Sequence, residues 1–564
     1  MSNFSKLVVR VFRAYSLEEK VLSLIAFLVI GFTFAQSINV FFKGNKIFDD
    51  KSAITIGLIS ERAVVINPLY GDLNEANREV SRLIFSGLTK YDPQSKSFVG
   101  DLAEVKISED KKQYDFTLKN NITWHDGQPV TADDIIFTYQ LIQDPNFQNP
   151  ILKANFDGIK FEKVDERTIR FALKNPNSFF ITNLNVGILP KHLLDGVEVA
   201  TLPSNTFNLK PVGTGPYKAV SNLDIFDDGR EKIVLNVHDK YYSSLPRIRE
   251  IKFLIYPYAE QLLKEKNSLN IIPKVSTNLA SIFEDDQFVA VPYELPQYTA
   301  VFFNTEDPVL KNKMVRLALL KSLDKAQLIA DLFNKTRVDT PLLELSQADW
   351  MFKPNVSEAQ GAIFDSGYTF AKDKNGKVLE GEIYRKDKDG KVLELTLTAR
   401  QYSEDSPLYV DTAKTIDFLV NEWRKIGVKV NVVFVDDTKF VEVLQIRDYQ
   451  MLLAGQSLGY NFDTYPFWHS SQVNGVGLNI SLYKSFGADQ LIEKIRDSFD
   501  QTIKENRIKQ LATVINEDVP AIFLYRPRYS LATDGKVKGI VLQNLAYIND
   551  KFANIADWCI ECTM

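Results

Sequence analysis

The feature that most constrains the fold is a strand–helix–strand–helix–strand pattern between residues 393 and 454. Apolar residues alternate over 393–397 and again over 428–434, and alternation with period two is typical of half-buried strands. The helical face between these strands ends just before Gly427, where a glycine cap belongs. Such units require a parallel sheet with helices packed over it, so we predict a mixed α/β fold.

Ligands of open α/β sheets bind beyond the carboxyl ends of the parallel strands. Two groups of residues at these ends are therefore candidates for a cleft: Arg400, Gln401 and Tyr402, and Gly455, Gln456 and Ser457. The guanidinium of Arg400 could bind a ligand carboxylate through two parallel hydrogen bonds, or it could lie in solvent at the end of its strand.

The length of the chain, 564 residues, exceeds what one compact core supports, so we expect two or three lobes. Further alternating strands are predicted at 54–58, 114–118 and 169–173. Thr131 and Asp134 form a capping box that opens a helix. The proline- and glycine-rich segment 211–216 is typical of a lobe boundary, because such runs reset the direction of the chain.

An apolar run over 21–35, which continues more weakly to residue 42, is preceded by basic residues. About 20 apolar residues span a bilayer, and the basic flank favours a cytoplasmic N-terminus. We predict a transmembrane anchor at 21–42 and a cytoplasmic segment at 1–20; a cleaved signal peptide is the alternative. No cysteine lies in the run or directly after it, which excludes a lipid-modified N-terminus. Both interpretations place the remaining chain outside the cytoplasm.

Net charge is −5, and the charged residues are spread along the chain without a basic stripe. Proteins that bind nucleic acid concentrate lysine and arginine on one face to neutralise phosphates. We therefore expect no nucleic-acid partner.

The sequence offers no constellation for catalysis. Its four histidines have no metal-site spacing, and no GxSxG or Walker motif occurs. His125 beside Asp126 could be a base with its orienting acid, but Asp-Gly after an alternating strand favours a turn. We expect no enzyme activity, no cofactor and no metal site.

Two further motifs leave alternatives open. The segment 372–380 recurs at 386–394, and its Asn-Gly and Asp-Gly pairs predict hairpin turns rather than a calcium loop, which would need further ligands. The only cysteines, Cys559 and Cys562, form a CxxC that is either a structural pair or half of a metal site.

Several segments together resemble the family 5 extracellular solute-binding proteins, which include the dipeptide- and oligopeptide-binding receptors of ABC importers. They occur in family order at 83–89, 101–104, 114–137, 213–217, 238–242, 303–305, 314–318, 422–428 and 465–471. The strongest is Trp124-His125-Asp126-Gly127-Gln128-Pro129, and 213–217 reads as the family's GTGPY.

The resemblance implies a type II periplasmic-binding-protein fold, in which two lobes enclose the ligand and a subdomain is inserted in the first. Lobe I would comprise 51–90, 205–302 and 520–564, the inserted subdomain 91–204, and lobe II 303–519. It also implies a protein that binds peptides, delivers them to ABC permease and ATPase subunits, and acts as a monomer at the extracytoplasmic face of the membrane.

In the family, the backbone of an extended peptide pairs with strand edges of both lobes. The matching residues here are Ala63, Val64 and Val65 in the first lobe and 455–457 in the second. Tyr460 is a further candidate for ligand contact, or it packs between the lobes. Members that bind a free amino terminus carry an aspartate where this chain has Gly459. Asp463 is the nearest acid and could replace it.

Two other functions remain open. The altered amine anchor favours, as an alternative ligand, a non-peptide solute such as a nickel chelate, haem or an oligosaccharide. The chain could also be an envelope sensor or adhesion module that has lost transport and acts only through its membrane anchor.

Overall fold

The structure is a computed structural model that describes residues 53–275, 288–332, 334–404, 406–460, 463–474 and 477–562. All of them belong to one compact unit, 53–564. The predicted cytoplasmic segment 1–20 and anchor 21–42 lie outside the described residues. Within the described part of the chain, no helix has both the length and the apolar character that crossing a bilayer requires.

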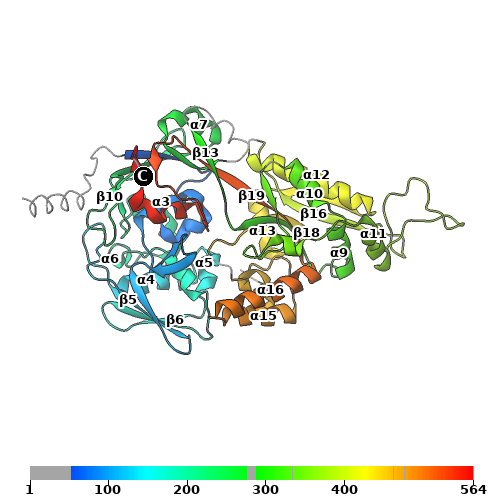
Figure 1. The fold of residues 1–564 in the computed structure, drawn as a ribbon, viewed down its shortest axis with the longest axis horizontal. Helices are drawn as coiled ribbons and strands as arrows, with labels where there is room; N and C mark the ends of the chain where they lie inside the picture. Colours follow the sequence, from blue (N-terminus) through cyan, green and yellow to red (C-terminus); the bar gives the residue numbers. More distant parts are fainter. Residues whose placement is uncertain are drawn as a thin grey trace, which may run out of the picture. The chain divides into compact units, whose positions relative to one another are not determined.

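A 13-stranded sheet runs through the described residues (Figure 1). Its main order is β17 (Lys429–Val435), β16 (Glu394–Arg400), β18 (Met451–Ser457), β14 (Gln297–Phe303), β19 (Ala521–Thr533), β12 (Ile271–Val275), β1 (Ala53–Ile59), β11 (Glu250–Tyr256), β10 (Glu231–Val237) and β8 (Tyr217–Ala219). Off this path, β13 (Val289–Glu294) and β15 (Lys335–Arg337) pair with β19, and β9 (Asp224–Ile225) pairs with β10.

The parallel strands lie where the sequence pattern predicts them. β16 runs parallel to both β17 and β18, and the connections are α12 (Pro407–Lys425) and α13 (Asp437–Ile446). Gly427 has a φ of +83°, a conformation that favours glycine, directly after the end of α12. The predicted mixed α/β fold is confirmed.

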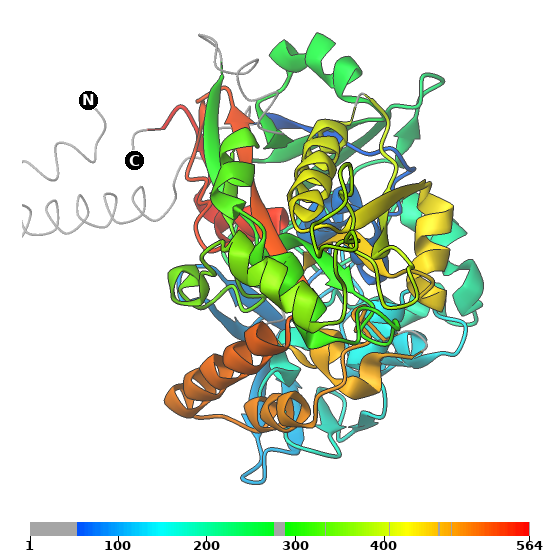
Figure 2. The same cartoon turned by 90° about the vertical axis from the view of Figure 1, so that its right-hand side faces the viewer.

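Helices cover both faces of the sheet at these strands. Along β14, Val301 and Phe303 enter one core, whereas Ala300 and Phe302 enter another on the opposite face. The helices α9 (Lys313–Lys321), α10 (Lys325–Asp331), α11 (Val356–Asp365) and α12 lie on the first face, and α15 (Phe486–Arg496) and α16 (Gln501–Asp518) on the second. Figure 2 shows these two layers in green to yellow and in orange.

A separate core contains β1, β10, β11 and α3 (Glu75–Ile84), together with a four-stranded sheet. That sheet has the order β4 (Ala103–Ile107), β5 (Gln113–Leu118), β7 (Thr168–Ala172) and β6 (Lys160–Lys163), with α4 (Ala132–Gln143) beside it. The predicted capping box is present, because the Thr131 N–H donates to Asp134 Oδ2 over 2.9 Å and α4 begins at the next residue. We call residues 53–275 and 537–560 the first region, and residues 297–525 the second region.

Shorter elements complete the fold. They are β2 (Thr89–Asp92), β3 (Ser97–Gly100), β20 (Val537–Lys538), β21 (Cys559–Ile560), α5 (Pro150–Asn155), α6 (Lys191–Leu194), α7 (Ala259–Lys264) and α14 (Tyr465–Trp468). The 3-10 helices are η1 (Pro68–Leu73), η2 (Phe180–Asn185), η3 (Val199–Ser204), η4 (Thr206–Leu209), η5 (Lys266–Ser268), η7 (Gln347–Trp350), η8 (Ser470–Gln472) and η9 (Ile548–Asp557).

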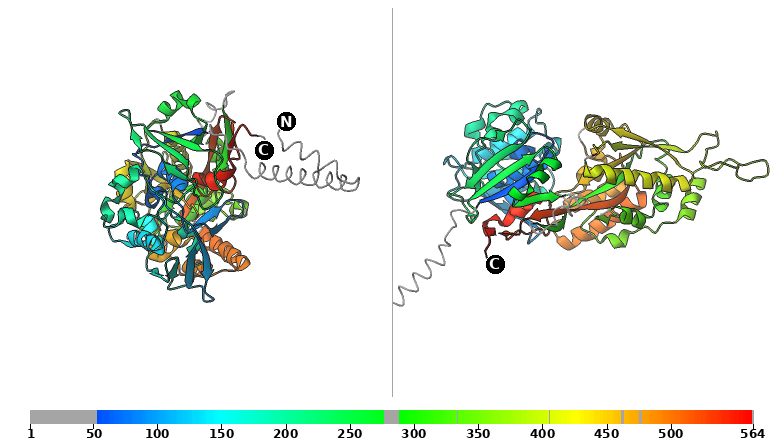
Figure 3. Two further views of the ribbon diagram at one scale, coloured as in Figure 1. Left: turned by 90° about the vertical axis from the view of Figure 1, so that its left-hand side faces the viewer. Right: turned by 90° about the horizontal axis from the view of Figure 1, so that it is seen from above.

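Two stretches of chain connect the first region to the second. β19 pairs with β14 through its first residues and with β12 and β13 through its last ones, and it runs from one region to the other (Figure 3). β13 continues into β14 through Leu295 and Pro296. Beside them, the carboxylate of Glu294 accepts hydrogen bonds of 2.8 Å from Arg528 and Thr336 and pairs with Arg526 at 2.8 Å.

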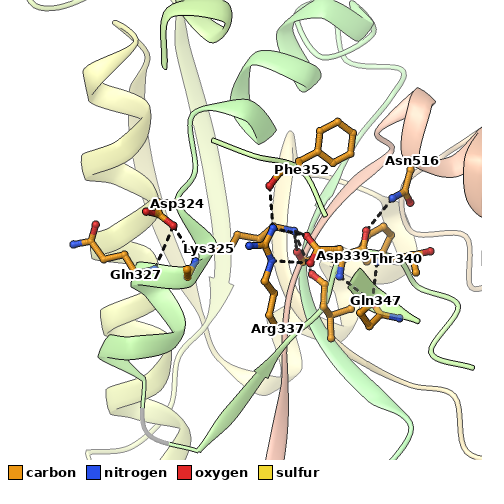
Figure 4. A network of polar contacts seen from close by, with 12 residues as sticks. Asp324, Lys325, Gln327, Arg337, Asp339, Thr340, Gln347, Phe352 and Asn516 are labelled. Carbon is orange, nitrogen blue, oxygen red and sulfur yellow. Dashed lines mark hydrogen bonds and ion pairs between the residues drawn. The ribbon is translucent and has the colours of Figure 1, made fainter. Parts of the chain in front are cut away.

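A buried polar network fixes the start of α10 against β15 (Figure 4). The Lys325 ammonium is 2.5 Å from Asp339 and also donates to two backbone carbonyls, and Arg337 holds the same carboxylate at 2.6 Å. Burial lowers the pKa of Lys325 to about 8, although Asp339 opposes the shift. A buried network of this kind favours one arrangement of the chain.

The two repeats form the predicted turns. Asp373 Oδ1 accepts the N–H groups of Asn375 and Lys377, and Asp387 Oδ1 accepts those of Asp389 and Lys391. Both hairpins extend away from the sheet at the right-hand edge of Figure 1. The CxxC is a structural pair, because Cys559 and Cys562 form a disulfide. The predicted lobe boundaries remain predictions.

Candidate functional site

A cavity of about 410 Å³ lies between α3 and η9 of the first region and the end of β18 in the second. Its walls combine apolar surface with a few polar groups, which is typical of ligand sites. The residues that line it include Glu75, Arg78, Ser81, Arg82, Tyr91, Gln297, Ser457, Tyr460, Tyr547 and Asn549.

Helix α3 brings charged side chains to this cavity. The Asn74 side chain caps the helix by accepting the Ala76 N–H over 2.8 Å. Glu75, Arg78 and Arg82 then follow at spacings of three and four residues, which places them on one face of the helix. The guanidinium carbon of Arg78 lies 3.8 Å from the ring centre of Tyr547, close enough for a cation–π contact.

Arg82 lies between this cavity and a smaller one of about 340 Å³. Its guanidinium makes no hydrogen bond and no ion pair within 4.0 Å with any residue that the structure describes. Burial opposes its charge, but Tyr460, Asp101 and Asp550 raise the pKa of Arg82 above its usual value. Both carboxylates are themselves held by other donors: Asp101 by Tyr242 at 2.8 Å, and Asp550 by the Tyr547 N–H at 2.9 Å.

Glu75 is the single acidic residue among the described residues that line the larger cavity. Its carboxylate accepts hydrogen bonds of 2.7 and 2.9 Å from Lys274. Although burial opposes ionisation, Lys274 lowers the pKa of Glu75, so the carboxylate stays charged and neutralised. A second pair, Glu79 with Lys551, is fully buried in the first region, and both side chains are at most 2% exposed.

Two buried polar atoms of lining residues have no hydrogen-bond partner in the described part of the chain. They are Oγ of Ser81, on α3, and Oδ1 of Asn549, on η9. Such buried orphan groups are uncommon in folded proteins because each costs about 1–3 kcal/mol. Both atoms belong to residues that line the cavity.

The second region contributes the end of a strand. β18 pairs with β14 as far as Ser457, but its pairing with β16 stops at Leu453. The main chain of 454–457 therefore extends beyond the β16 ladder on that side. Gly455 is exposed, and an added Cβ there would approach only the Tyr298 carbonyl oxygen, at 3.9 Å.

The loop after β18 crosses to the first region. Gly459 has a φ of +58°, and an added Cβ would lie 1.9 Å from the Tyr547 hydroxyl oxygen. The ring of Tyr460 packs against Tyr91, Phe98 and Tyr547 at centroid distances of 4.8–5.4 Å, and its hydroxyl donates to Asp550. Tyr547 thus fills the space that a side chain at position 459 would need.

The structure brings only two of the predicted ligand-binding residues, Ser457 and Tyr460, to the cavity. Gly455 and Gln456 adjoin Ser457 on β18, and the Gln456 side chain accepts the Tyr298 hydroxyl. Ala63, Val64 and Val65 form no strand. The N–H groups of Val64 and Val65 donate to Glu231 at 3.0 Å and to Asn77 at 2.8 Å. Ligand contact by this segment stays a prediction.

The other predicted residues already have partners. Arg400 binds Asp437 through two hydrogen bonds of 2.5 and 2.6 Å, and its guanidinium lies 5.0 Å from the ring centre of Tyr402. Asp463 is buried and accepts a hydrogen bond of 2.9 Å from Arg496 Nε. Ligand contact by these residues stays a prediction.

Sequence reasoning missed the charged face of α3 and the polar residues of η9. The spacing of Glu75, Arg78 and Arg82 was a usable signal, because charged residues on one helical face normally lie in solvent or meet a partner. Asn549 gave no signal, since its place opposite α3 depends on contacts between segments far apart in the chain.

His125, the candidate base of the sequence analysis, has structural partners. His125 Nδ1 accepts the Gly213 N–H over 3.2 Å, which leaves Nε2 to donate to the Gly215 carbonyl at 3.1 Å. These bonds tie the turn at 124–127 to 213–217. Burial lowers the pKa of His125 to about 3, so the ring is neutral at physiological pH. Within the described residues, no group of three or more metal-ligating side chains is found.

Comparisons with known proteins agree with this architecture. The model of the bacterial extracellular solute-binding proteins, family 5 Middle, matches residues 97–477. The oligopeptide-binding protein AppA of Bacillus subtilis (strain 168) is 26% identical over 508 residues, which cover 86% of this chain and 88% of that protein.

Two solved structures are similar over most of the chain. The structure of the oligopeptide-binding protein AppA from Bacillus subtilis in complex with a nonapeptide has 25% identity and a TM-score of 0.70, and the match covers 90% of this chain and 98% of that one. The structure of NikZ from Campylobacter jejuni in complex with Ni(L-His) has 27% identity and a TM-score of 0.72, and the match covers 90% and 99%.

Proposed function

Because this chain belongs to the bacterial extracellular solute-binding proteins of family 5, we propose that it is the substrate-binding protein of an ABC importer and that its substrates are peptides. The relatives named for oligopeptide and dipeptide binding support this proposal. The observation that carries it is the cavity between α3 and the open end of β18, where an extended peptide can pair with main chain.

In this proposal the peptide backbone lies along 454–457, and the side chains of the peptide occupy the cavity. Main-chain hydrogen bonds supply affinity without regard to side-chain identity, which suits a receptor for varied peptides. Ser457 and Tyr460 contact the ligand directly, and Tyr460 also keeps the loop after β18 docked on the first region. No bond is made or broken, so we propose no enzyme activity.

The two connecting stretches, β19 and the junction of β13 with β14, are the proposed hinge. A ligand that contacts both regions favours the closed state by its differential affinity for that state. The closed state would then be recognised by the permease and ATPase subunits. The carboxylate of Glu294, which holds Arg526 and Arg528 on β19, restricts the backbone at this point.

The location and the assembly follow from the same family membership. We propose that the protein acts as a monomer at the extracytoplasmic face of the membrane, and that residues 21–42 anchor it there. A signal peptide cleaved near residue 35 would produce the same location without the anchor.

A nickel chelate is the second candidate ligand, because the NikZ structure is similar over 90% of this chain. Among the described residues that line the cavity none is histidine, so a bound metal would have to arrive with its own ligands.

Native mass spectrometry of the full-length chain purified from its own membrane fraction tests the function. We expect masses of short peptides that disappear on denaturation. A metal chelate, haem or an oligosaccharide in their place would contradict the proposal for peptides, and would support the alternative class of ligand.

A further inference from the structure

The charges around the larger cavity are unbalanced. Two arginines, Arg78 and Arg82, line it, and the single acidic residue among its described lining, Glu75, is neutralised by Lys274. The lining therefore offers the guanidinium of Arg82 to a ligand and no unpaired carboxylate that could hold an amino group.

The two arginines differ in their partners, and the guanidinium of Arg82 is the unusual one. It is partly buried and has no hydrogen-bond or ion-pair partner within the described residues. A guanidinium carries five N–H donors in a planar fork that fits a carboxylate, and the nitrogens of Arg82 are not among the buried unpartnered atoms of the described residues, so they are open to a ligand. An anion in the cavity would supply the missing acceptors.

The nearest acidic side chains do not fill this role. Asp101 is bound by Tyr242 and lies 3.6 Å from Lys90, and Asp550 is bound by Tyr460 and by the N–H groups of Ala546 and Tyr547. Both keep Arg82 charged through the field that they exert, but neither is within 4.0 Å of its nitrogens.

Position 459, in the loop after β18, is closed to an acidic side chain. Gly459 cannot carry a side chain while Tyr547 stays in position, because the Cβ would overlap the tyrosine hydroxyl. Arg78 in turn stacks on the Tyr547 ring at 3.8 Å. The same tyrosine thus excludes a carboxylate at 459 and orients a cation.

Building on the proposed function, we propose that the cleft recognises its peptide through a negatively charged group, a carboxylate held by Arg78 and Arg82, and not through a free amino terminus. Ser81 Oγ is then available to donate to the same carboxylate. Asn549 Oδ1 can accept an N–H of the peptide backbone, which would satisfy both orphan atoms.

The test compares four pools of random tetrapeptides that differ only at their ends. The N-terminus is free or acetylated, and the C-terminus is a carboxylate or an amide. Binding to the purified full-length chain is measured by isothermal titration calorimetry. We expect amidation to weaken binding at least tenfold and acetylation to change it less than threefold, as loss of a charge-assisted bond predicts.

Variants identify the residues responsible. Arg82→Gln should remove most of the preference for the carboxylate pools, and Arg82→Lys should retain part of it because the charge remains. Arg62→Gln is the matched control, since it removes one exposed positive charge outside the cavity. Thermal unfolding of each variant checks folding, and the preference of the unaltered protein tests the proposal even where a variant does not fold.

Each outcome is decisive. Equal binding of carboxylate and amide pools overturns the proposed anion recognition and leaves the peptide receptor intact. Binding that depends on the free amino group, with no effect of amidation, does the same. If no pool binds, the proposed peptide function fails, and the anion proposal that depends on it fails too.

Discussion

The two walls of the cavity are built on different principles. The wall from α3 presents charged side chains at helical spacing, whereas the wall from β18 presents the backbone of a strand whose neighbour has ended. Side chains distinguish one ligand from another, and main-chain groups treat all peptides alike. In the proposed function, selectivity would therefore reside in the first region and general affinity in the second.

The α3 wall is expected to be the more fragile, because it is supported by a buried ion pair. In Glu79→Gln, Lys551 would lose the carboxylate that opposes the lowering of its pKa by burial, and its other acceptor among the described residues is the Ile548 carbonyl at 3.4 Å. Removing one partner of a buried pair costs about 3–5 kcal/mol of unfolding free energy. Chemical denaturation measures the loss.

Glu442→Gln is the control for this change. Glu442 pairs with Lys439 on the surface of α13, where both side chains are about half exposed, and its loss should cost no more than about 0.5 kcal/mol. A similar small loss in Glu79→Gln would contradict the view that the buried pair holds α3 in place.

The next largest loss of stability is expected at Gly459, in the loop where the β18 wall meets Tyr547 of the first region. In Gly459→Ala, a side chain would adopt φ +58° and collide with Tyr547, so we expect a loss of about 1–3 kcal/mol. Ligand affinity should fall as well, because Tyr547 orients Arg78.

Gly487→Ala is the matched change elsewhere. Gly487 lies in the first turn of α15, and nothing lies within 4 Å of its added Cβ. This variant should be unchanged or slightly more stable, since alanine favours helix. If both variants behave alike, the tight contact with Tyr547 is not important.

The difference between the walls also explains what the sequence could predict. The parallel strands, the cap at Gly427 and the capping box at Thr131 depend on residues close in sequence, and periodicity identifies them. The cavity joins Arg82, Ser457 and Asn549, which lie on three separate segments. Periodicity shows that a face exists but not which segment it meets.

Asp463 shows that proximity in sequence can also suggest a site residue that the structure pairs elsewhere. It is the nearest acid in sequence to Gly459, and proximity in sequence made it a candidate for binding an amino group. In the structure its carboxylate turns to Arg496 at the end of α15 and also accepts the Tyr465 N–H over 3.1 Å. A loop residue can point in any direction, so its neighbours in space are fixed by tertiary packing.

The smallest expected effect is on ligand affinity, and it compares the two walls most directly because it uses one serine from each. Ser81→Ala removes a buried hydroxyl that has no partner in the described structure, so stability should not fall, but ligand affinity should drop about fivefold if Oγ donates to the bound carboxylate. Ser457→Ala alters an exposed side chain of a residue that we propose to act through its backbone, so both quantities should change less than twofold. Calorimetry on the two variants with the same peptide pool decides the matter: a larger loss of affinity at Ser457 than at Ser81 would reverse the assignment of selectivity to the α3 wall.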